Sequence, residues 1–458
     1  MRDSQRVEVL LNDKTIGGVH LPASAIQDLL NEYYARYHAF CPILPRQSIF
    51  LTYSDSSVLL LVSWDFHSLC DVVRDLVADS IWPANGSILS LQAILLLCCW
   101  PLPFQRNEDP SHAFVAQATH LGLRLGLHRP GHETEFDNPS PDGEREMIQR
   151  MAWVTCFITN VSTSAQLGLP ATIRLDCGLL GILTSKPSWL PDTLFSQLHI
   201  ARQALNIGST LGDCISSNTG LLDETAPFVR NFETELRALE FQSHHSWSPA
   251  DRIIYCGTQI MLYTLALTID SSKSKITVHM DSHSHWLVCA SVAATTTIQT
   301  ALSIVDQLLY APSRPQKIVL NAICLLLLMK GSRYSELVEK HTLDSAINQG
   351  GELLRDLSTT TGDFMSRACS LLDQLGRYTE RLKPEDKTEQ FLLVRLRMGA
   401  NVPFTTAIRA REALRKSRAN TPHDINWQEP EMSDLELQDI DLPLGFDWNE
   451  LFGMGLDF

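Results

Sequence analysis

The sequence predicts an all-α fold, with one large multi-helix domain followed by a flexible acidic C-terminal tail. Apolar residues recur at three- and four-residue intervals through most of the chain, which is the period of a helix with one buried face. Alternating runs typical of strands are sparse. Hydrophobic residues make up 44% of the 458 residues and charged residues 19%, which is the composition of a chain that buries a core.

The first helix is predicted to begin after Pro22, because Ser24 and Gln27 have the spacing of a capping box. Its apolar face repeats as far as Tyr37, and Pro42 prevents it from continuing. The same period between turn residues predicts further helices at 66–82, 88–100, 110–128, 144–166, 192–213, 250–269, 285–309, 316–331, 371–382 and 404–418.

The charge divides the chain. The formal net charge is −15, yet residues 424–458 hold ten of the 52 Asp and Glu residues and no Lys or Arg, so the rest of the chain is close to neutral. We therefore expect four parts. They are a short leader (1–22), a helical domain (23–400), a basic linker or helix (401–423) and the acidic tail (424–458).

Composition and motifs exclude several function classes. An acidic chain does not bind nucleic acid by electrostatics alone, because that binding depends on Lys and Arg displacing counterions from phosphates. The glycine, serine and histidine patterns of nucleotide-binding loops, hydrolases and metalloproteases are absent, so we do not expect an enzyme. The two longest apolar runs, 88–100 and 318–329, are shorter than the about 20 residues that cross a bilayer.

The 11 cysteines are spread evenly, mostly within apolar stretches, and no C-x-x-C spacing occurs. This distribution predicts buried thiols in a reducing compartment rather than disulfides or a zinc site. The adjacent pair Cys98 and Cys99 is interpreted as inert core, because no basic neighbour in the sequence would lower a thiol pKa. A redox-sensing role for this pair is the alternative.

The acidic tail contains the candidate functional residues. Trp448, Leu451 and Phe452 form one apolar stripe if the segment becomes helical, and Phe446 and Asp447 precede them. Carboxylates keep such a segment solvated while its aromatic anchors can fold into a coactivator groove. The alternatives are a merely solubilising terminus and a helix that docks back on the body.

Three other clusters have structural interpretations. Residues 279–285 hold three His and an Asp, which could bind a metal, but they follow a polar run and predict an exposed loop. Residues 128–130 (HRP) predict a cationic helix C-terminus rather than an anion contact. The basic stretch 409–418 predicts a solvated helix face rather than a nuclear-import or DNA-contacting patch.

Four segments resemble the regulatory region of fungal zinc binuclear-cluster transcription factors, and most closely the group of the leucine-biosynthesis and secreted-protease regulators. They are residues 33–45 (YYARYHAFCPILP), 91–103 (LQAILLLCCWPLP), 118–130 (ATHLGLRLGLHRP), and Arg150–Trp153 followed by Gly168–Pro170. The four follow one another in the family's order, which makes the resemblance more specific than any single segment. It extends over residues 21–178.

The resemblance implies a nuclear transcription regulator whose helical domain receives a small-molecule signal and controls the acidic tail. Its expected partners are a coactivator or the transcription machinery at the tail, and a second subunit in a homo- or heterodimer. The family's zinc cluster is absent from this sequence, because the residues before the first helix contain no Cys, and no other cofactor is expected. DNA contact would then come through a partner or a missing N-terminal head. The alternative is a helical small-molecule-binding or interaction scaffold without transcriptional output.

Overall fold

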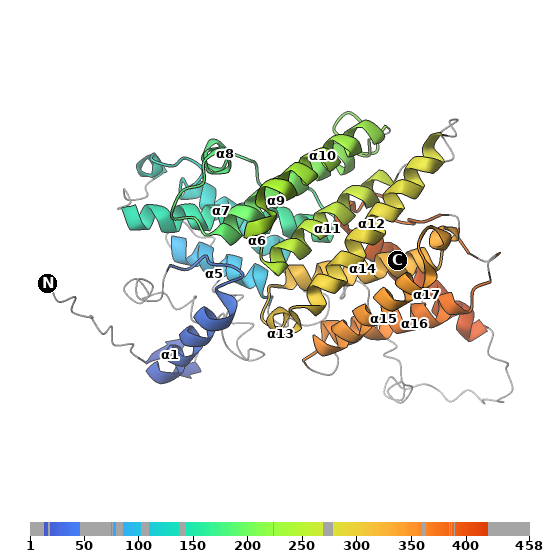
Figure 1. The fold of residues 1–458 in the computed structure, drawn as a ribbon. Helices are drawn as coiled ribbons and strands as arrows, with labels where there is room; N and C mark the ends of the chain where they lie inside the picture. Colours follow the sequence, from blue (N-terminus) through green and yellow to red (C-terminus); the bar gives the residue numbers. More distant parts are fainter. Residues whose placement is uncertain are drawn as a thin grey trace, which may run out of the picture.

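The computed structural model describes residues 13–16, 19–45, 75, 77–78, 86–101, 110–136, 143–222, 224–268, 278–359, 363–383, 385, 387–388 and 390–419. Helices dominate these residues (Figure 1). The prediction of an all-α fold is confirmed. One short antiparallel hairpin, β1 (Lys14–Ile16) with β2 (Val19–Leu21), precedes the first helix and pairs Thr15 with His20. No sequence pattern had indicated this hairpin.

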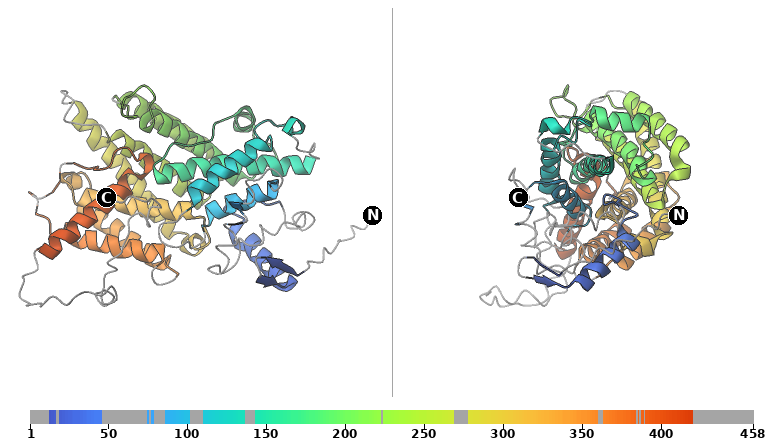
Figure 2. Two further views of the ribbon diagram at one scale, coloured as in Figure 1. Left: turned by 180° about the vertical axis from the view of Figure 1, so that it is seen from behind. Right: turned by 90° about the vertical axis from the view of Figure 1, so that its left-hand side faces the viewer.

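The helices form two apolar cores. The N-terminal core is built on α1 (Ala23–Glu32), α5 (Ile88–Cys99), α6 (Ser111–Arg124), α7 (Gly143–Leu167), α8 (Cys177–Thr184) and α9 (Asp192–Ile207). The C-terminal core is built on α10 (Ala226–Ser243), α11 (Pro249–Ala266), α12 (Val278–Leu302), α13 (Val305–Leu308), α14 (Ser313–Lys330), α15 (Lys340–Asp356), α16 (Phe364–Glu380) and α17 (Asn401–Ala419). Figure 2 shows them at opposite ends of an elongated molecule, and α9 packs against both α7 and α11.

Short helical turns complete the described structure. Two are π-helical, η1 (Tyr33–Tyr37) and η4 (Gly208–Gly212). Four are 3₁₀-helical, η3 (Glu133–Phe136), η5 (His244–Ser246), η6 (Arg333–Leu337) and η8 (Met398–Ala400). Among the described residues, no helix combines the length and the apolar character that crossing a membrane requires.

The two segments at 33–45 and 91–103 pack against each other. The Gln92 side chain, fully buried on α5, donates to the carbonyl of Ile43 at 2.9 Å. The Tyr37 and Trp100 rings meet edge to face at 5.7 Å, and the Trp100 Nε1 donates to the carbonyl of Tyr310 at 3.1 Å. α5 is apolar on every side, so it needs neighbours all round. Residues 33–45 supply one of these neighbours.

The segments at 118–130 and at 150–153 with 168–170 form the packing interface between α6 and α7. Gly122 lies against the Trp153 ring, where a Cβ atom would come within 2.5 Å of a ring carbon. Asn160, fully buried on α7, donates to the Thr119 hydroxyl at 2.8 Å and to that of Thr172 at 2.7 Å. Paired in this way, a polar side chain can be buried in an apolar core.

Most predicted helices are present, with shifted ends. α6 ends at Arg124 rather than near residue 128, because Gly126 adopts a positive φ of 75° and the Leu127 amide bonds back to the Gly122 carbonyl. α1 begins at Ala23, whose amide is capped by Asp13 at 2.8 Å, and the predicted capping box at Ser24 is wrong. Helices α8, α10 and α15 were not predicted.

One prediction of a loop is wrong. Residues 279–285 do not form an exposed loop, since α12 already begins at Val278. The polar run before it concealed the helix start, because the apolar period becomes regular only from Trp286 onward. Residues 401–419, for which a linker or a helix was expected, form α17, and its Val402, Ala407 and Ala410 side chains belong to the C-terminal core.

Two predicted regions cannot be compared. Most of the helix expected at 66–82 lies outside the described residues, although Val77 is described as helical and buried. The acidic tail 424–458, with Phe446, Asp447, Trp448, Leu451 and Phe452, also lies outside them.

Gly168 joins the two cores and provides a test of this packing. It follows α7 with a φ of 70°, and a Cβ there would come within 2.5 Å of the carbonyl oxygen of Arg397, just before η8. We expect Gly168→Ala to lower the free energy of unfolding by more than about 2 kcal/mol, because left-handed strain and a backbone clash add. Denaturant unfolding of the full chain measures it.

The matched control is Gly181→Ala on α8. Gly181 is exposed, has no positive φ, and a Cβ there would meet nothing within 4 Å. This change should be neutral or stabilise by about 0.5–1 kcal/mol, since alanine favours a helix. Equal effects of the two substitutions would contradict the role assigned to Gly168.

Candidate functional site

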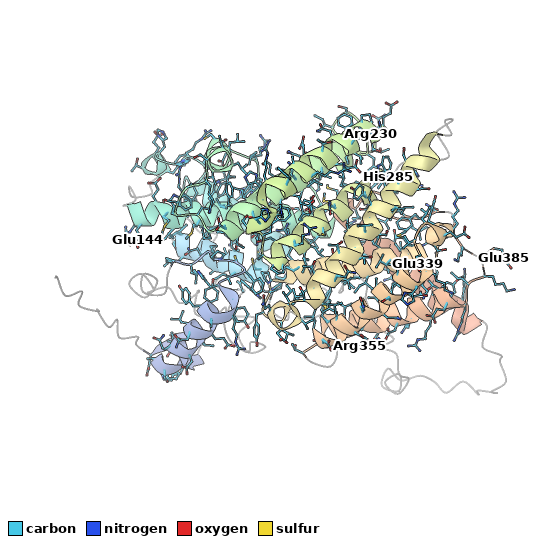
Figure 3. The ribbon with its side chains drawn as sticks, in the orientation of Figure 1. Glu144, Arg230, His285, Glu339, Arg355 and Glu385 are labelled. Carbon is cyan, nitrogen blue, oxygen red and sulfur yellow. The ribbon has the colours of Figure 1, made fainter. Side chains whose placement is uncertain are left out.

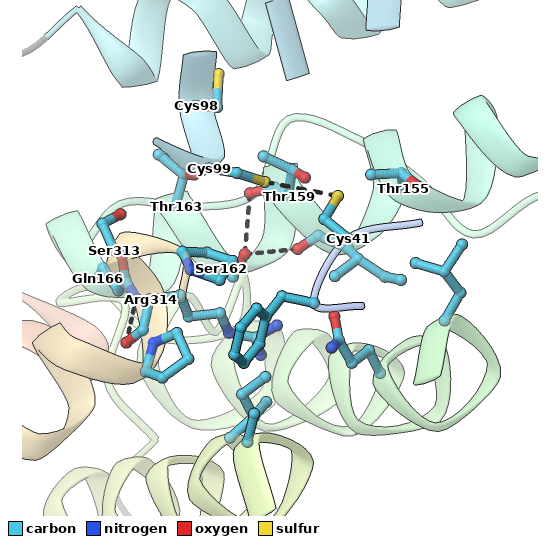
Figure 4. Close-up of a pocket in the computed structure, with 18 residues that line it drawn as sticks. Cys41, Cys98, Cys99, Thr155, Thr159, Ser162, Thr163, Gln166, Ser313 and Arg314 are labelled. Carbon is cyan, nitrogen blue, oxygen red and sulfur yellow. Dashed lines mark hydrogen bonds between the residues drawn. The ribbon is translucent and has the colours of Figure 1, made fainter. Parts of the chain in front are cut away.

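A polar cavity lies where the two cores meet (Figure 4). Its wall is formed by the segment after η1, the end of α5, one face of α7, residues of α9 and α11, and the start of α14. Its polar lining consists of Cys41, Cys98, Cys99, Thr155, Thr159, Ser162, Thr163, Gln166, Gln197, Ser313 and Arg314. Its volume of about 50 Å³ suits a few water molecules or a small ion, not a metabolite, which needs roughly 300 Å³ or more.

Arg314 is the positive charge of this cavity. Its Nη1 atom is buried and has no hydrogen-bond partner among the described residues, although the residue as a whole keeps partial exposure. Burial lowers the pKa of its guanidinium to about 10, against the opposing effect of Asp251 and Cys99 nearby. A guanidinium remains charged at neutral pH even so, and a buried unpaired charge favours an anionic partner.

Asp251 does not supply that partner directly. Its carboxylate already accepts from the Ser248 amide at 3.0 Å, the Ser248 hydroxyl at 2.8 Å and the Gln197 side chain at 3.0 Å. The bond from the Ser248 amide and the reciprocal bond from the Asp251 amide to the Ser248 hydroxyl, at 3.2 Å, form the capping box that starts α11. Burial raises the pKa of Asp251, and the hydrogen bonds to its carboxylate oppose that shift. Asp251 therefore caps α11, and its charge raises the pKa of the Arg314 guanidinium against the effect of burial.

The environment of Cys99 differs from the one that the sequence indicated, because a second thiol and a basic side chain lie near it. Its Sγ lies 3.9 Å from the Sγ of Cys41. The pKa of Cys99 is lowered, first by the hydrogen bond with Cys41 and further by Thr159 and Arg314, against the effect of burial. The basic neighbour is Arg314, which the fold brings from more than 200 residues away, so no local sequence signal could have revealed it.

A second, open groove lies on the N-terminal core and has a volume of about 490 Å³, which is within the range of small-molecule sites. Its lining residues come from the turn after α6, from α7 and from α8, and they are Arg129, Pro130, His132, Arg150, Cys177, Gly178, Gly181, Ile182, Ser185 and Pro187. The volume makes this groove, rather than the inter-core cavity, the better candidate for a metabolite.

Charge in the groove comes from Arg129. Arg150 pairs with Glu146 at 3.5 Å, whereas no ion pair of Arg129 occurs among the described residues, and its Nη1 lies 3.9 Å from the Cys177 Sγ. The interpretation of residues 128–130 as a cationic helix terminus is therefore wrong, because α6 has already ended at Arg124. The turn instead places Arg129 at the groove.

The groove wall is positioned by Trp153 and Asp176. The Trp153 Nε1 donates to one carboxylate oxygen of Asp176 at 2.6 Å, and the other oxygen accepts from the Leu179 amide at 2.9 Å to cap α8. Trp153 therefore holds the start of α8 against α7.

Together, these residues define an all-α domain with one open groove and one enclosed cavity, each lined by a positively charged side chain. Residues 63–183 match the fungal specific transcription factor domain. The match contains the segments at 91–103 and 118–130 and the groove residues from Arg129 to Ile182, and residues 33–45 lie before it. This part of the chain is therefore similar to the fungal transcription factors that contain the domain.

Particular relatives agree with this assignment. The chain is 26% identical over 293 residues to the putative transcription factor SEF1 of Eremothecium gossypii, covering 59% of this chain and 27% of that protein. It is 24% identical over 262 residues to the regulatory protein LEU3 of Saccharomyces cerevisiae, covering 50% of this chain and 29% of that protein. The chain thus matches less than a third of each relative's length. No solved structure matches it.

The environment of Cys99 predicts its reactivity. At neutral pH Cys99 should react with iodoacetamide faster than Cys156, whose pKa burial raises to about 12, because the thiolate is the nucleophile. Arg314→Gln should slow Cys99 several-fold, since removing a positive charge raises the thiol pKa, and should leave Cys156 unchanged. Mass spectrometry of peptides after timed labelling gives both rates. An unchanged Cys99 rate in the variant would refute the influence of Arg314.

Proposed function

We propose that this chain is the regulatory part of a nuclear fungal transcription regulator, in which a helical body receives a signal and an acidic tail activates transcription. The main support is the match of residues 63–183 to the fungal specific transcription factor domain. Arg129, Arg150 and Cys177 all lie within that match, so the region shared with the relatives also forms most of the groove.

The signal is a small molecule that binds the groove. Its volume of about 490 Å³ is sufficient for a metabolite, and Arg129 favours a ligand with negative charge. Binding would shift the population between one arrangement in which the tail is masked and one in which it is free, to the extent that the ligand binds one of them more tightly.

DNA contact is proposed to come through a partner protein or through a zinc-cluster head not present in the printed sequence. The close-spaced cysteines that hold such a cluster do not occur in this chain. A homodimer or a heterodimer would bring two such contacts together. The relatives are named as transcription factors and regulatory proteins, which supports regulation rather than catalysis.

A helical binding scaffold without transcriptional output is the alternative, and the groove alone is compatible with it. Chromatin immunoprecipitation of the tagged chain discriminates the two, with promoter occupancy and nuclear enrichment expected for the regulator. Uniform cytoplasmic distribution and no promoter enrichment would favour the scaffold.

The tail gives the direct test of activation. Residues 424–458 fused to an unrelated DNA-binding domain should activate a reporter, and Trp448→Ala combined with Phe452→Ala should lower the activity at least about tenfold, because anchors of this kind carry most of the binding energy in a helix-in-groove contact. Met432→Ala, which removes an apolar side chain outside the stripe, is the matched control. A silent wild-type fusion would exclude the tail as an activator.

A further inference from the structure

Three side chains with possible metal-ligand atoms lie together on the surface of the C-terminal core, away from the cavity and the groove. Glu233 lies on α10, and His285 and Cys289 lie one turn apart on α12. The His285 Nε2 is 3.8 Å from a carboxylate oxygen of Glu233 and 3.6 Å from the Cys289 Sγ. All three donor atoms lie within 4.8 Å of one another. Figure 3 shows His285 on α12, beside the end of α10 that carries Arg230.

One carboxylate oxygen of Glu233 has no hydrogen-bond donor within the described part of the chain, although the Tyr263 hydroxyl is a hydrogen-bond partner of the carboxylate. Its side chain is only 9% exposed, and its Oε1 atom has no hydrogen-bond partner among the described residues. The imidazole of His285 is too distant to donate to it. A buried carboxylate oxygen without a donor is unfavourable, and a cation at this position would satisfy it.

The distances suit a tetrahedral metal ion. Bonds of about 2.3 Å to sulfur and about 2.0–2.1 Å to nitrogen or oxygen separate tetrahedral ligands by roughly 3.3–3.6 Å, close to the 3.6 and 3.8 Å seen here. The spacing of His285 and Cys289 by four residues places both on one face of α12. A thiol, an imidazole and a carboxylate together are the donor set of zinc and of neighbouring divalent transition metals.

We propose that Glu233, His285 and Cys289 bind a zinc-class divalent metal ion that joins α10 to α12. Binding forms bonds to the Cys289 Sγ, the His285 Nε2 and a Glu233 oxygen, and it releases the Cys289 thiol proton to solvent. The His285 side chain is 58% exposed, so the ion reaches the site directly from solvent. Water occupies the fourth position, which makes the bound metal exchangeable.

The neighbouring groups are compatible with such an ion. Tyr263 on α11 adjoins Cys289 and Glu233, and burial followed by these two groups raises its pKa. Arg237 on α10 lowers the pKa of Cys289, although burial and Glu233 raise it overall. Arg237 is exposed, so its guanidinium can turn away into solvent when a dication binds. A bound cation would favour the Cys289 thiolate, as metals do for coordinating thiols.

Cobalt(II) titration of the reduced full chain tests the site, because tetrahedral Co²⁺ substitutes for Zn²⁺ and absorbs light. We expect one equivalent of Co²⁺ to produce a thiolate charge-transfer band, and Zn²⁺ to displace it. Cys289→Ser should abolish that band, and His285→Asn should weaken Co²⁺ binding at least about tenfold. Cys214→Ser and His245→Asn, which alter a partly exposed thiol and an exposed imidazole elsewhere, should leave the titration unchanged.

Glu233→Gln completes the test, and circular dichroism establishes whether each variant is folded. Because Glu233 is buried, this variant could lose structure, and the exposed His285→Asn then decides the question. The proposal is overturned if the folded wild type binds no Co²⁺ with a charge-transfer band. It is also overturned if the band and affinity persist in Cys289→Ser and His285→Asn.

Discussion

The arrangement of this protein depends on the burial of α7. Residues from Ile148 to Leu167 are buried along nearly the whole helix, which requires other helices around it on most sides. α5, α6 and α9 supply those neighbours in the N-terminal core, and η8 and α14 reach its C-terminal part from the other core. α7 therefore contributes to the walls of both the cavity and the groove.

Polar side chains on α7 explain why the junction is not a dry core. Thr155 and Ser162 satisfy their hydroxyls on carbonyls of the preceding turn, so they can face apolar surroundings without a distant partner. Where this polar face meets α14, side chains no longer fill the space, and Arg314 enters it. A charged residue at such a position needs compensation from solvent or a ligand, which gives the cavity its chemical character.

Local signals in the sequence were sufficient for the helices and insufficient for the sites. Helical period and prolines located α5, α7 and α14 to within a few residues, because each depends on its own segment. Residues 279–285 were misassigned because their polar character suggested solvent, while Glu233 lies on a helix that the sequence did not reveal. The environment of Cys99 was also missed, because Arg314 and Cys41 approach its thiol only after folding. Sites assembled from distant segments leave no local pattern.

The groove and the proposed metal site lie in different cores, and this placement constrains how ligands at the two sites influence each other. The groove belongs to the N-terminal core, whereas the cluster of Glu233, His285 and Cys289 belongs to the far face of the C-terminal core. The two cores touch through α9 against α10 and α11, through α7 against η8 and α14, and through the turn at Gly168 against the backbone before η8. Packed helices move as units between discrete arrangements rather than deforming continuously. Ligands at the two places would therefore influence each other by changing how the helices pack at these contacts. A rigid contact such as that of Gly168 would transmit the change better than a flexible side chain.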